Sequence, residues 1–223
     1  MINLWGLLLT ILVFEFAKKM KQFPFLGKIP PMMLSGLILI TFLLMFKIEY
    51  SFYNESACFL TLLLGPATIA LALPLSDNAA ILTKNKRAVY FGFVIAVITA
   101  IVSTIVLGQI FHADWKLIIS LIPKTVTTPI AIEISKVIGG IPELTACMVV
   151  LTGIYGAMFG HKILKICKIK SDIATGLSIG ATSHVLGTST CIERNRKKQV
   201  VMSTLALIII GILTTIFCVF FFE

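Results

Sequence analysis

The stretch Ser120–Gly140, "SLIPKTVTTPIAIEISKVIGG", gathers prolines, lysines, threonines and a glutamate in a chain that is otherwise strongly apolar. Hydrophobic residues make up 58% of its 223 residues, and charged residues only 13%. A soluble domain could not bury so much apolar surface, whereas several membrane spans could. The sequence therefore predicts an all-α integral membrane protein that forms a single polytopic domain over 1–223. The polar and helix-breaking residues of this stretch must then be explained by a role within the membrane.

Six apolar segments are expected to cross the bilayer, and four of them lie within 1–116, before the polar stretch. The segments are 2–17, 31–46, 57–75, 88–110, 141–161 and 200–222. The first two are shorter than a typical span. Two further segments, 117–138 and 172–193, are long enough to cross but are rich in Gly, Pro, Ser and Thr. The charges between segments decide how these two lie.

The formal net charge of +9 comes from short basic runs between the apolar segments, so it indicates membrane topology and not a nucleic-acid partner. The runs are Lys18/Lys19/Lys21/Lys28, Lys84/Lys86/Arg87, Lys162/Lys165/Lys168/Lys170 and Arg194/Arg196/Lys197/Lys198. Basic loops are cytoplasmic as a rule. A full crossing at 117–138 would carry the third run outside, and one at 172–193 would separate the last two. The charges therefore favour two re-entrant hairpins that enter from opposite faces.

The two hairpins would give the chain an inverted repeat. Each of the units 117–166 and 172–222 holds a hairpin followed by a span, and their orientations are opposite, as in carriers that bind substrate at the bilayer midplane. Broken backbone at that depth is tolerated only where protein or a water-filled cavity surrounds it. Residues expected to break or turn the helices are Pro123, Pro129, Gly139, Gly140, Gly180 and Gly187.

The third apolar segment also contains helix breakers. Pro66, which follows a glycine, and Pro74 would interrupt its hydrogen bonding, and Thr68 offers a hydroxyl between them. A simple kink explains these residues as well as a binding site does.

Hydroxyls and helix ends in the hairpins predict a site for a small carboxylate. Half-helix N-termini present unpaired N–H groups to an anion, and hydroxyls add further donors without a buried arginine. The candidate substrate-binding residues are Thr68, Thr125, Thr127, Thr128, Ser183, His184, Thr188 and Ser189. Each of them alone is also explained as an ordinary helix-packing residue.

Two titratable residues are candidates for proton coupling. His184 lies inside the second hairpin and has an ordinary pKa near neutrality, although a structural histidine is an equal alternative. Glu133 is an intramembrane carboxylate, which a pair with Lys136 would also explain. Lys124 would attract an anion or extend to the surface. We expect no enzyme activity, cofactor or metal site, since the five cysteines are scattered and no catalytic motif is present.

Four stretches carry a resemblance to a known family: "LLGPATIALALPL", "IPKTVTTPIAIEISKVIGGIPELTA", "TGIYGAMFG" and "IATGLSIGATSHVLGTSTCIE". Together they resemble the LrgB/CidB family of bacterial membrane proteins, once called antiholin-like, over essentially the whole chain. The plastid glycolate/glycerate carrier contains a related domain. The motif positions carried over are Pro123, Lys124, Thr127, Thr128, Glu133, Gly139, Gly140, Gly180, Ser183, His184, Gly187, Thr188 and Glu193.

The resemblance implies a multi-pass protein of a bacterial plasma membrane with one of two roles. The first is a secondary carrier of small monocarboxylates such as pyruvate, lactate, glycolate or glycerate. The second is a holin-like regulator of murein hydrolase activity and cell lysis. It also implies a small LrgA/CidA-type membrane partner, and we expect a homo-oligomer. The chain departs from its relatives at Ser76–Asp77 and in the basic link "RNRKKQ" after Glu193. The first departure bears on substrate identity, and the second on regulation.

Overall fold

The computed structural model describes residues 4–20, 22, 29, 31–63, 66 and 86–222. Every regular element in these ranges is a helix. The chain divides into two compact units, Met1–Ala70 and Leu71–Glu223. The all-α prediction is therefore confirmed for the described residues.

The N-terminal unit contains three helices, α1 (Trp5–Met20), α2 (Pro31–Met45) and α3 (Tyr50–Leu62). Helix α1 packs against both of the others. Its contact with α3 is polar, because the Gly6 N–H donates to Ser56 Oγ at 2.8 Å and Thr10 Oγ1 lies 2.7 Å from Tyr53 Oη. The helix expected at 57–75 begins earlier, after the N-cap Glu49, because the polar residues that precede the apolar segment belong to the same helix.

The C-terminal unit is built on three long helices, α7 (Lys86–Ile110), α10 (Pro142–Ile166) and α12 (Lys197–Phe222). Each contains a window long and apolar enough to cross a membrane. They correspond to the segments expected at 88–110, 141–161 and 200–222. Among the described residues these are the candidate spans, and α2 is a shorter apolar helix.

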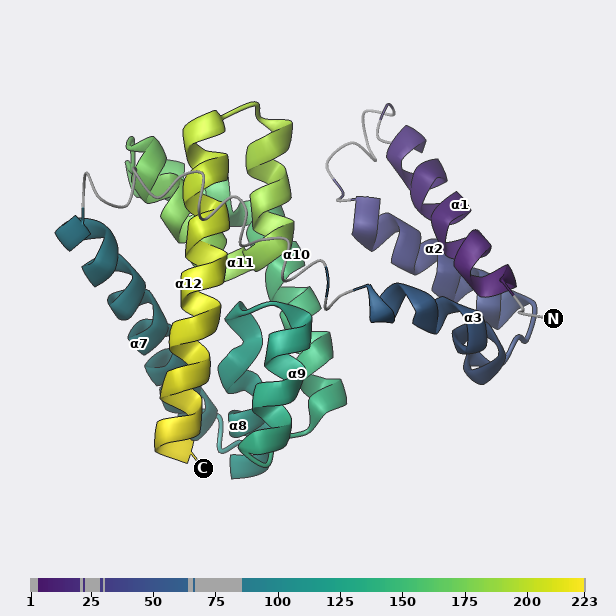
Figure 1. Cartoon of the computed structure of the whole chain (residues 1–223), viewed down its shortest axis with the longest axis horizontal. Coiled ribbons are helices and arrows are strands. Elements are labelled where there is room, and N and C mark those ends of the chain that lie inside the picture. Colours follow the sequence, from purple (N-terminus) through teal and green to yellow (C-terminus); the bar gives the residue numbers. More distant parts are fainter. Residues whose placement is uncertain are drawn as a thin grey trace. The chain divides into compact units, whose positions relative to one another are not determined.

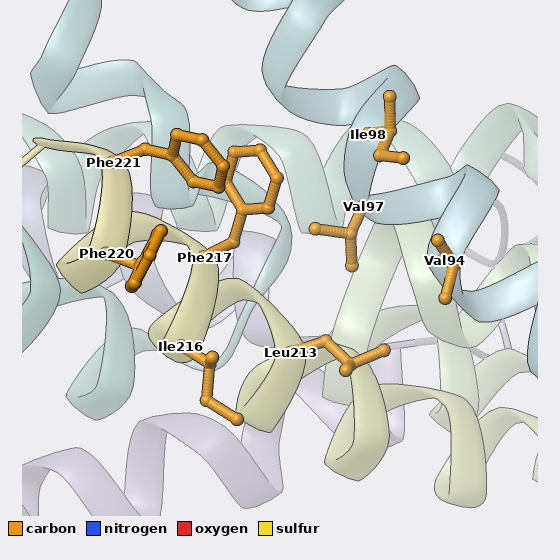
Figure 2. A pocket seen from close by; sticks show the side chains of 8 residues that line it. All are labelled: Val94, Val97, Ile98, Leu213, Ile216, Phe217, Phe220 and Phe221. Atoms are coloured by element: carbon orange, nitrogen blue, oxygen red, sulfur yellow. The ribbon is translucent and has the colours of Figure 1, made fainter.

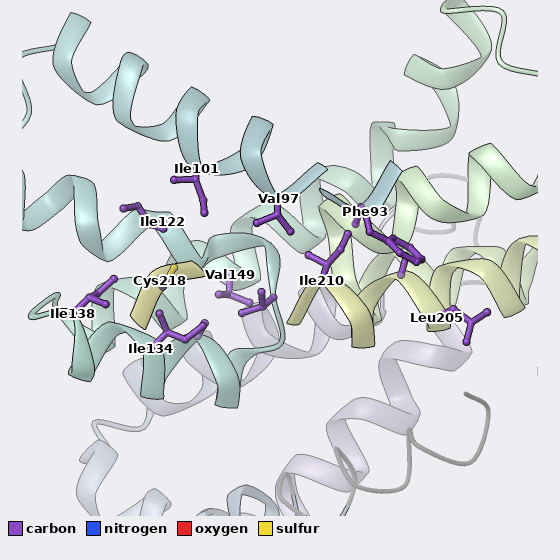
Figure 3. Packing of buried hydrophobic residues seen from close by; sticks show 14 of the residues in the cluster. Phe93, Val97, Ile101, Ile122, Ile134, Ile138, Val149, Leu205, Ile210 and Cys218 are labelled. Carbon is purple, nitrogen blue, oxygen red and sulfur yellow. The ribbon is translucent and has the colours of Figure 1, made fainter. Parts of the chain in front are cut away.

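The hydrophobic core of this unit lies where α7 and α12 meet the hairpin helices (Figure 1). Figure 3 shows Phe93, Val97 and Ile101 of α7 in the same cluster as Leu205 and Ile210 of α12. Apolar residues of the polar stretch, such as Ile122 and Ile134, are buried in it too. The polar stretch therefore packs into the core through its apolar side chains. Its polar side chains lie on its other faces.

The first hairpin consists of α8 (Trp115–Leu121), the short 3-10 helix η2 (Ile122–Thr125) and α9 (Thr128–Val137). Helix geometry stops at Val126, where ψ is 178°, and resumes after Thr127. Thr145 Oγ1 donates to the Ser120 carbonyl at 2.7 Å and lies 2.7 Å from Ser135 Oγ, from which it accepts. A straight helix would hold those two residues about 22 Å apart. The chain therefore reverses between α8 and α9.

The end of this hairpin turns tightly into α10. Gly139 has a φ of 79°, a value that favours glycine. A Cβ on Gly140 would lie 2.5 Å from Ser135 Oγ, and the Ile141 N–H donates to Ser120 Oγ at 2.8 Å. The turn thus brings both arms of the hairpin to the beginning of α10.

The second hairpin is α11 (Asp172–Glu193), whose helix is broken at His184 with φ 40° and ψ −131°. A Cβ on Gly187 would lie 2.9 Å from the carbonyl oxygen of Ile179. A straight helix would separate these two residues by about 12 Å. This segment therefore also reverses direction, at a position that has neither glycine nor proline.

The two hairpins approach each other from opposite ends of α10. The open end of the first lies at Thr145, near the beginning of α10, and the open end of the second lies at His161, near its end. The broken backbone of the second reaches Val149, and η2 of the first contacts α11. The two breaks therefore meet partway along α10.

Candidate functional site

At the break in the first hairpin, one buried hydroxyl group has no hydrogen-bond partner. Thr127 is the N-cap of α9 and is 5% exposed. Its side chain makes no capping hydrogen bond, and among the described residues its Oγ1 is the one buried side-chain nitrogen or oxygen without a hydrogen-bond partner. An unsatisfied buried polar group costs about 1–3 kcal/mol. The Thr127 hydroxyl therefore lowers the stability of the empty protein. Polar groups that carry such a cost are often ones that bind a ligand.

The surroundings of Thr127 suit an anion. The first N–H groups of α9 have no partner within the helix, and they carry the positive end of its dipole. Pro129, in the first turn, has no N–H group to offer, so the backbone donors are those of neighbours such as Thr128. Thr125 is buried beside them. A hydroxyl and backbone N–H groups converging at a helix start form a carboxylate-binding arrangement.

Lys124 supplies a positive charge close to this helix start. Its ammonium donates to Thr104 Oγ1 of α7 at 2.5 Å, and the side chain is partly buried. Lys124 thus turns toward α7 and is partly buried there. Pro123 beside it is buried, is the second residue of η2 and has non-helical φ and ψ.

The break in the second hairpin is held by His184. Its side chain is 4% exposed, and its Nε2 lies 3.0 Å from the Val149 carbonyl oxygen of α10. Because a carbonyl only accepts, Nε2 carries the proton. A Cβ on Gly153 would lie 2.8 Å from this nitrogen, so the missing side chain makes room for the imidazole. The histidine therefore positions the turn against α10.

The hydroxyls around His184 are already bonded. Ser183 Oγ lies 3.1 Å from Thr182 Oγ1, and the Thr188 hydroxyl donates to the His184 carbonyl at 2.9 Å. Ser189 Oγ donates to the Leu186 carbonyl at 2.7 Å. These donors serve the local backbone or a neighbour, which distinguishes them from Thr127.

The remaining predicted residues lie away from the two breaks or outside the described residues. Glu133 has a side chain that is 70% exposed, and its Oε1 pairs with Lys136 Nζ at 2.7 Å on the outer face of α9. Gly180 is buried against the Ser203 backbone of α12. Thr68 and Pro74 fall outside the described residues, and Pro66 is an exposed residue between undescribed neighbours.

Sequence reasoning missed a polar chain at the open end of the second hairpin. His161 Nε2 lies 3.2 Å from Gln199 Oε1, and His161 Nδ1 lies 3.4 Å from Thr190 Oγ1. Gln199 Nε2 in turn donates to Asp172 Oδ1 at 2.7 Å. A signal was present, because His161 follows Gly153 by two helical turns and so shares the face that packs on α11.

The grooves on this unit differ in chemistry. One of about 250 Å³ runs between α7 and α12 and is lined only by aliphatic and phenyl side chains (Figure 2). It offers no donor to a carboxylate. A second, of about 230 Å³, lies along α10 and the first arm of α11, where Thr152, Ser178, Thr182 and Ser183 contribute hydroxyls. Only the second groove reaches a predicted site residue.

Comparison with known proteins gives one family. A family model described as the LrgB-like family matches residues 10–223. The uncharacterized protein YwbG of Bacillus subtilis is 34% identical over 214 residues, which are 96% of this chain and 94% of that protein. A second uncharacterized Bacillus subtilis protein, YxaC, is 31% identical over 95% of this chain and 91% of its own length. An uncharacterized Haemophilus influenzae protein is 35% identical over 85% of this chain and 82% of its own length. No solved structure matches the chain.

Proposed function

Since this chain belongs to the LrgB-like family of membrane proteins, we propose that it is a secondary carrier of small monocarboxylates such as pyruvate, lactate, glycolate or glycerate. The observation that carries this proposal is the buried, unpartnered hydroxyl of Thr127 at the start of α9, beside the point where the two hairpins meet. The substrate carboxylate accepts hydrogen bonds from this hydroxyl and from the free N–H groups of α9.

The cost of the broken backbone supports a carrier over a scaffold. Two helix interruptions inside an apolar unit expose backbone groups that lipid cannot satisfy, so they persist where they surround a binding site. The cation beside the first interruption is Lys124. One nearby cation and a few donors match a small anion of single charge better than a dicarboxylate.

The orientation in the membrane follows from the basic runs. We propose that α7, α10 and α12 cross the bilayer, that the first hairpin enters from outside and that the second enters from the cytoplasm. The open end of the second hairpin lies beside the basic residues that follow His161 and Glu193. Opposite entry gives each side of the membrane its own hairpin between solution and site, as alternating access requires.

Cysteine labelling tests this orientation. Single cysteines replacing Arg87, Lys168 and Lys197, in a variant without the native cysteines, are expected to react with an impermeant maleimide only from the cytoplasmic side. A cysteine replacing Lys116, at the open end of the first hairpin, is expected to react only from outside. Labelling of position 168 from outside would restore a full crossing at 117–138 and end the two-hairpin topology.

Uptake into liposomes tests the function itself. The purified protein, alone and with a small LrgA/CidA-type subunit, is reconstituted and offered labelled pyruvate, lactate, glycolate and glycerate. We expect saturable uptake of at least one anion, competed by the unlabelled compound and absent from protein-free liposomes. No uptake of any of the four, with or without the subunit, would overturn the carrier.

The regulator of murein hydrolase activity and cell lysis is the second candidate. It acts through a small membrane partner, and the apolar groove between α7 and α12 offers a surface to such a partner or to a second copy of this chain (Figure 2). This role predicts altered lysis in cells lacking the protein together with no uptake in liposomes.

A further inference from the structure

The polar chain at the open end of the second hairpin joins three helices. Asp172 belongs to the first arm of α11 and Thr190 to the second arm, while His161 belongs to α10 and Gln199 to α12. Gln199 is 8% exposed and His161 is half-buried. The imidazole lies in the middle of the chain and contacts Gln199 through one ring nitrogen and Thr190 through the other.

The direction of each hydrogen bond around His161 can be worked out from its neighbours. Gln199 must turn its amide nitrogen to Asp172, because a carboxylate only accepts, and so its oxygen faces His161 Nε2. The Thr190 hydroxyl donates to the Gly187 carbonyl at 2.7 Å, so it presents a lone pair to His161 Nδ1. Both ring nitrogens therefore face acceptors.

A neutral imidazole cannot satisfy both contacts while the Thr190 hydroxyl donates to the Gly187 carbonyl. With that bond kept, the nitrogen that lacks the proton places its lone pair against another lone pair, and only the imidazolium donates at both positions. Cys191 Sγ lies 3.9 Å from Nε2, and a thiol is a weak donor that does not change this count.

The charges that face His161 come from its own helix and from both neighbours. Asp172 of α11 is linked to it through one amide, and a positive charge on the ring is compensated along that link. Burial of the ring disfavours such a charge, the hydrogen bond with Gln199 favours it, and Arg194, just after α11, repels it. Lys162 and Lys165 of α10 and Lys197 and Lys198 of α12 are exposed to solvent, which screens them.

We propose that His161 is a proton-binding site, and that the bound proton fastens both arms of the second hairpin to α10 and α12. With the proton present, His161 is bonded to Thr190 on one arm and, through Gln199, to Asp172 on the other. Loss of the proton turns either the Thr190 or the Gln199 contact repulsive and so frees one arm of the hairpin. A further step rests on the proposed function: the proton bound here is the one whose gradient drives the anion.

The proton site is tested first without transport. Protein carrying ¹⁵N-labelled histidine is studied by NMR, and the His161 signals are assigned by comparison with His161→Gln. We expect the share of His161 rings with both nitrogens protonated to rise as the pH falls from 8.5 to 5. In Thr190→Val the ratio of doubly to singly protonated His161 at pH 6 should fall about tenfold, since a charged donor loses its acceptor.

The matched control is Thr215→Val, which removes a threonine hydroxyl bonded to a carbonyl of its own helix, away from His161. It should leave the His161 ratio unchanged. A His161 ring with the same proton count at both pH values, or a ratio that ignores Thr190→Val, would overturn the proton site.

Transport then tests the coupling step. His161→Gln should lose accumulation driven by a pH gradient while it keeps counterflow of the anion at equal pH. Accumulation that survives in His161→Gln would overturn coupling through this residue. If the wild-type protein carries none of the anions, the proposed function fails, whereas the NMR result still decides whether His161 binds the proton.

Discussion

Gly156→Ala is expected to displace the second hairpin and to lower the stability of the C-terminal unit. A Cβ on Gly156 would overlap Ser183 Oγ and would lie 2.5 Å from Ser183 Cβ. A rotamer change moves the oxygen away but leaves the carbon in place. Overpacking of a fitted contact costs about 1–3 kcal/mol, and here the backbone of α11 must shift as well. Thermal unfolding in detergent measures the loss.

Two further variants make this prediction specific. In Gly36→Ala the added Cβ has no heavy atom within 4 Å, and alanine is favoured over glycine inside a helix by about 1 kcal/mol, so stability should hold or rise. The double variant Gly156→Ala/Ser183→Gly removes both clashing atoms and should recover most of the stability lost. A Gly156→Ala protein as stable as Gly36→Ala would show that α10 and α11 do not pack this closely.

Thr127→Val is expected to separate function from stability. The valine keeps the shape of the side chain and removes a buried hydroxyl that has no partner, so the empty protein should become more stable by about 1 kcal/mol. The same hydroxyl is proposed to bond the substrate carboxylate. A hydrogen bond to a charged group contributes about 1.5–3 kcal/mol, so the affinity for the anion should fall by about tenfold to a hundredfold.

The measurement compares anion uptake at several concentrations with thermal unfolding of the same preparation. Thr215→Val, which loses a hydroxyl that is already bonded, should show the opposite pattern, with unchanged uptake and equal or lower stability. Uptake by Thr127→Val at the wild-type level would remove the start of α9 from the binding site.

The sequence predicted the helical class and the three long helices of the C-terminal unit, because apolar length is a direct signal. Charge counting predicted re-entrant hairpins at 117–138 and 172–193; both segments reverse direction in the structure, and their re-entrant course through a membrane stays a prediction. The exact residues at which the two hairpin helices break were harder to predict from the sequence. Prolines flank the first break at Val126, but the second falls at His184, where contacts with Val149 and Gly153 impose a backbone that local preferences would not choose.

The candidate site shows the same limit. Composition marked a whole set of hydroxyls as equal candidates, and only their hydrogen bonds distinguish Thr127, which has no partner, from Thr188 and Ser189, which do. Glu133 seemed intramembrane by position, yet its side chain faces outward and pairs with Lys136. The contacts of His161 are with Thr190 and Gln199, which are remote from it in the sequence.

The left-handed backbone at His184 has a consequence for how the protein is made. A non-glycine residue with a φ of 40° is strained by about 1–3 kcal/mol and is stable only where its surroundings hold it. The restraints come from α10, which is made before this segment and contacts His184, and from α12, which is made after it and packs against Gly180 through Ser203. While α12 is still being synthesised, 172–193 lacks half of its support, and a straight helix of about 33 Å is the less strained form. The contacts with α12 then complete the support of the bend, so 172–193 is expected to take its final course only after α12 has been made.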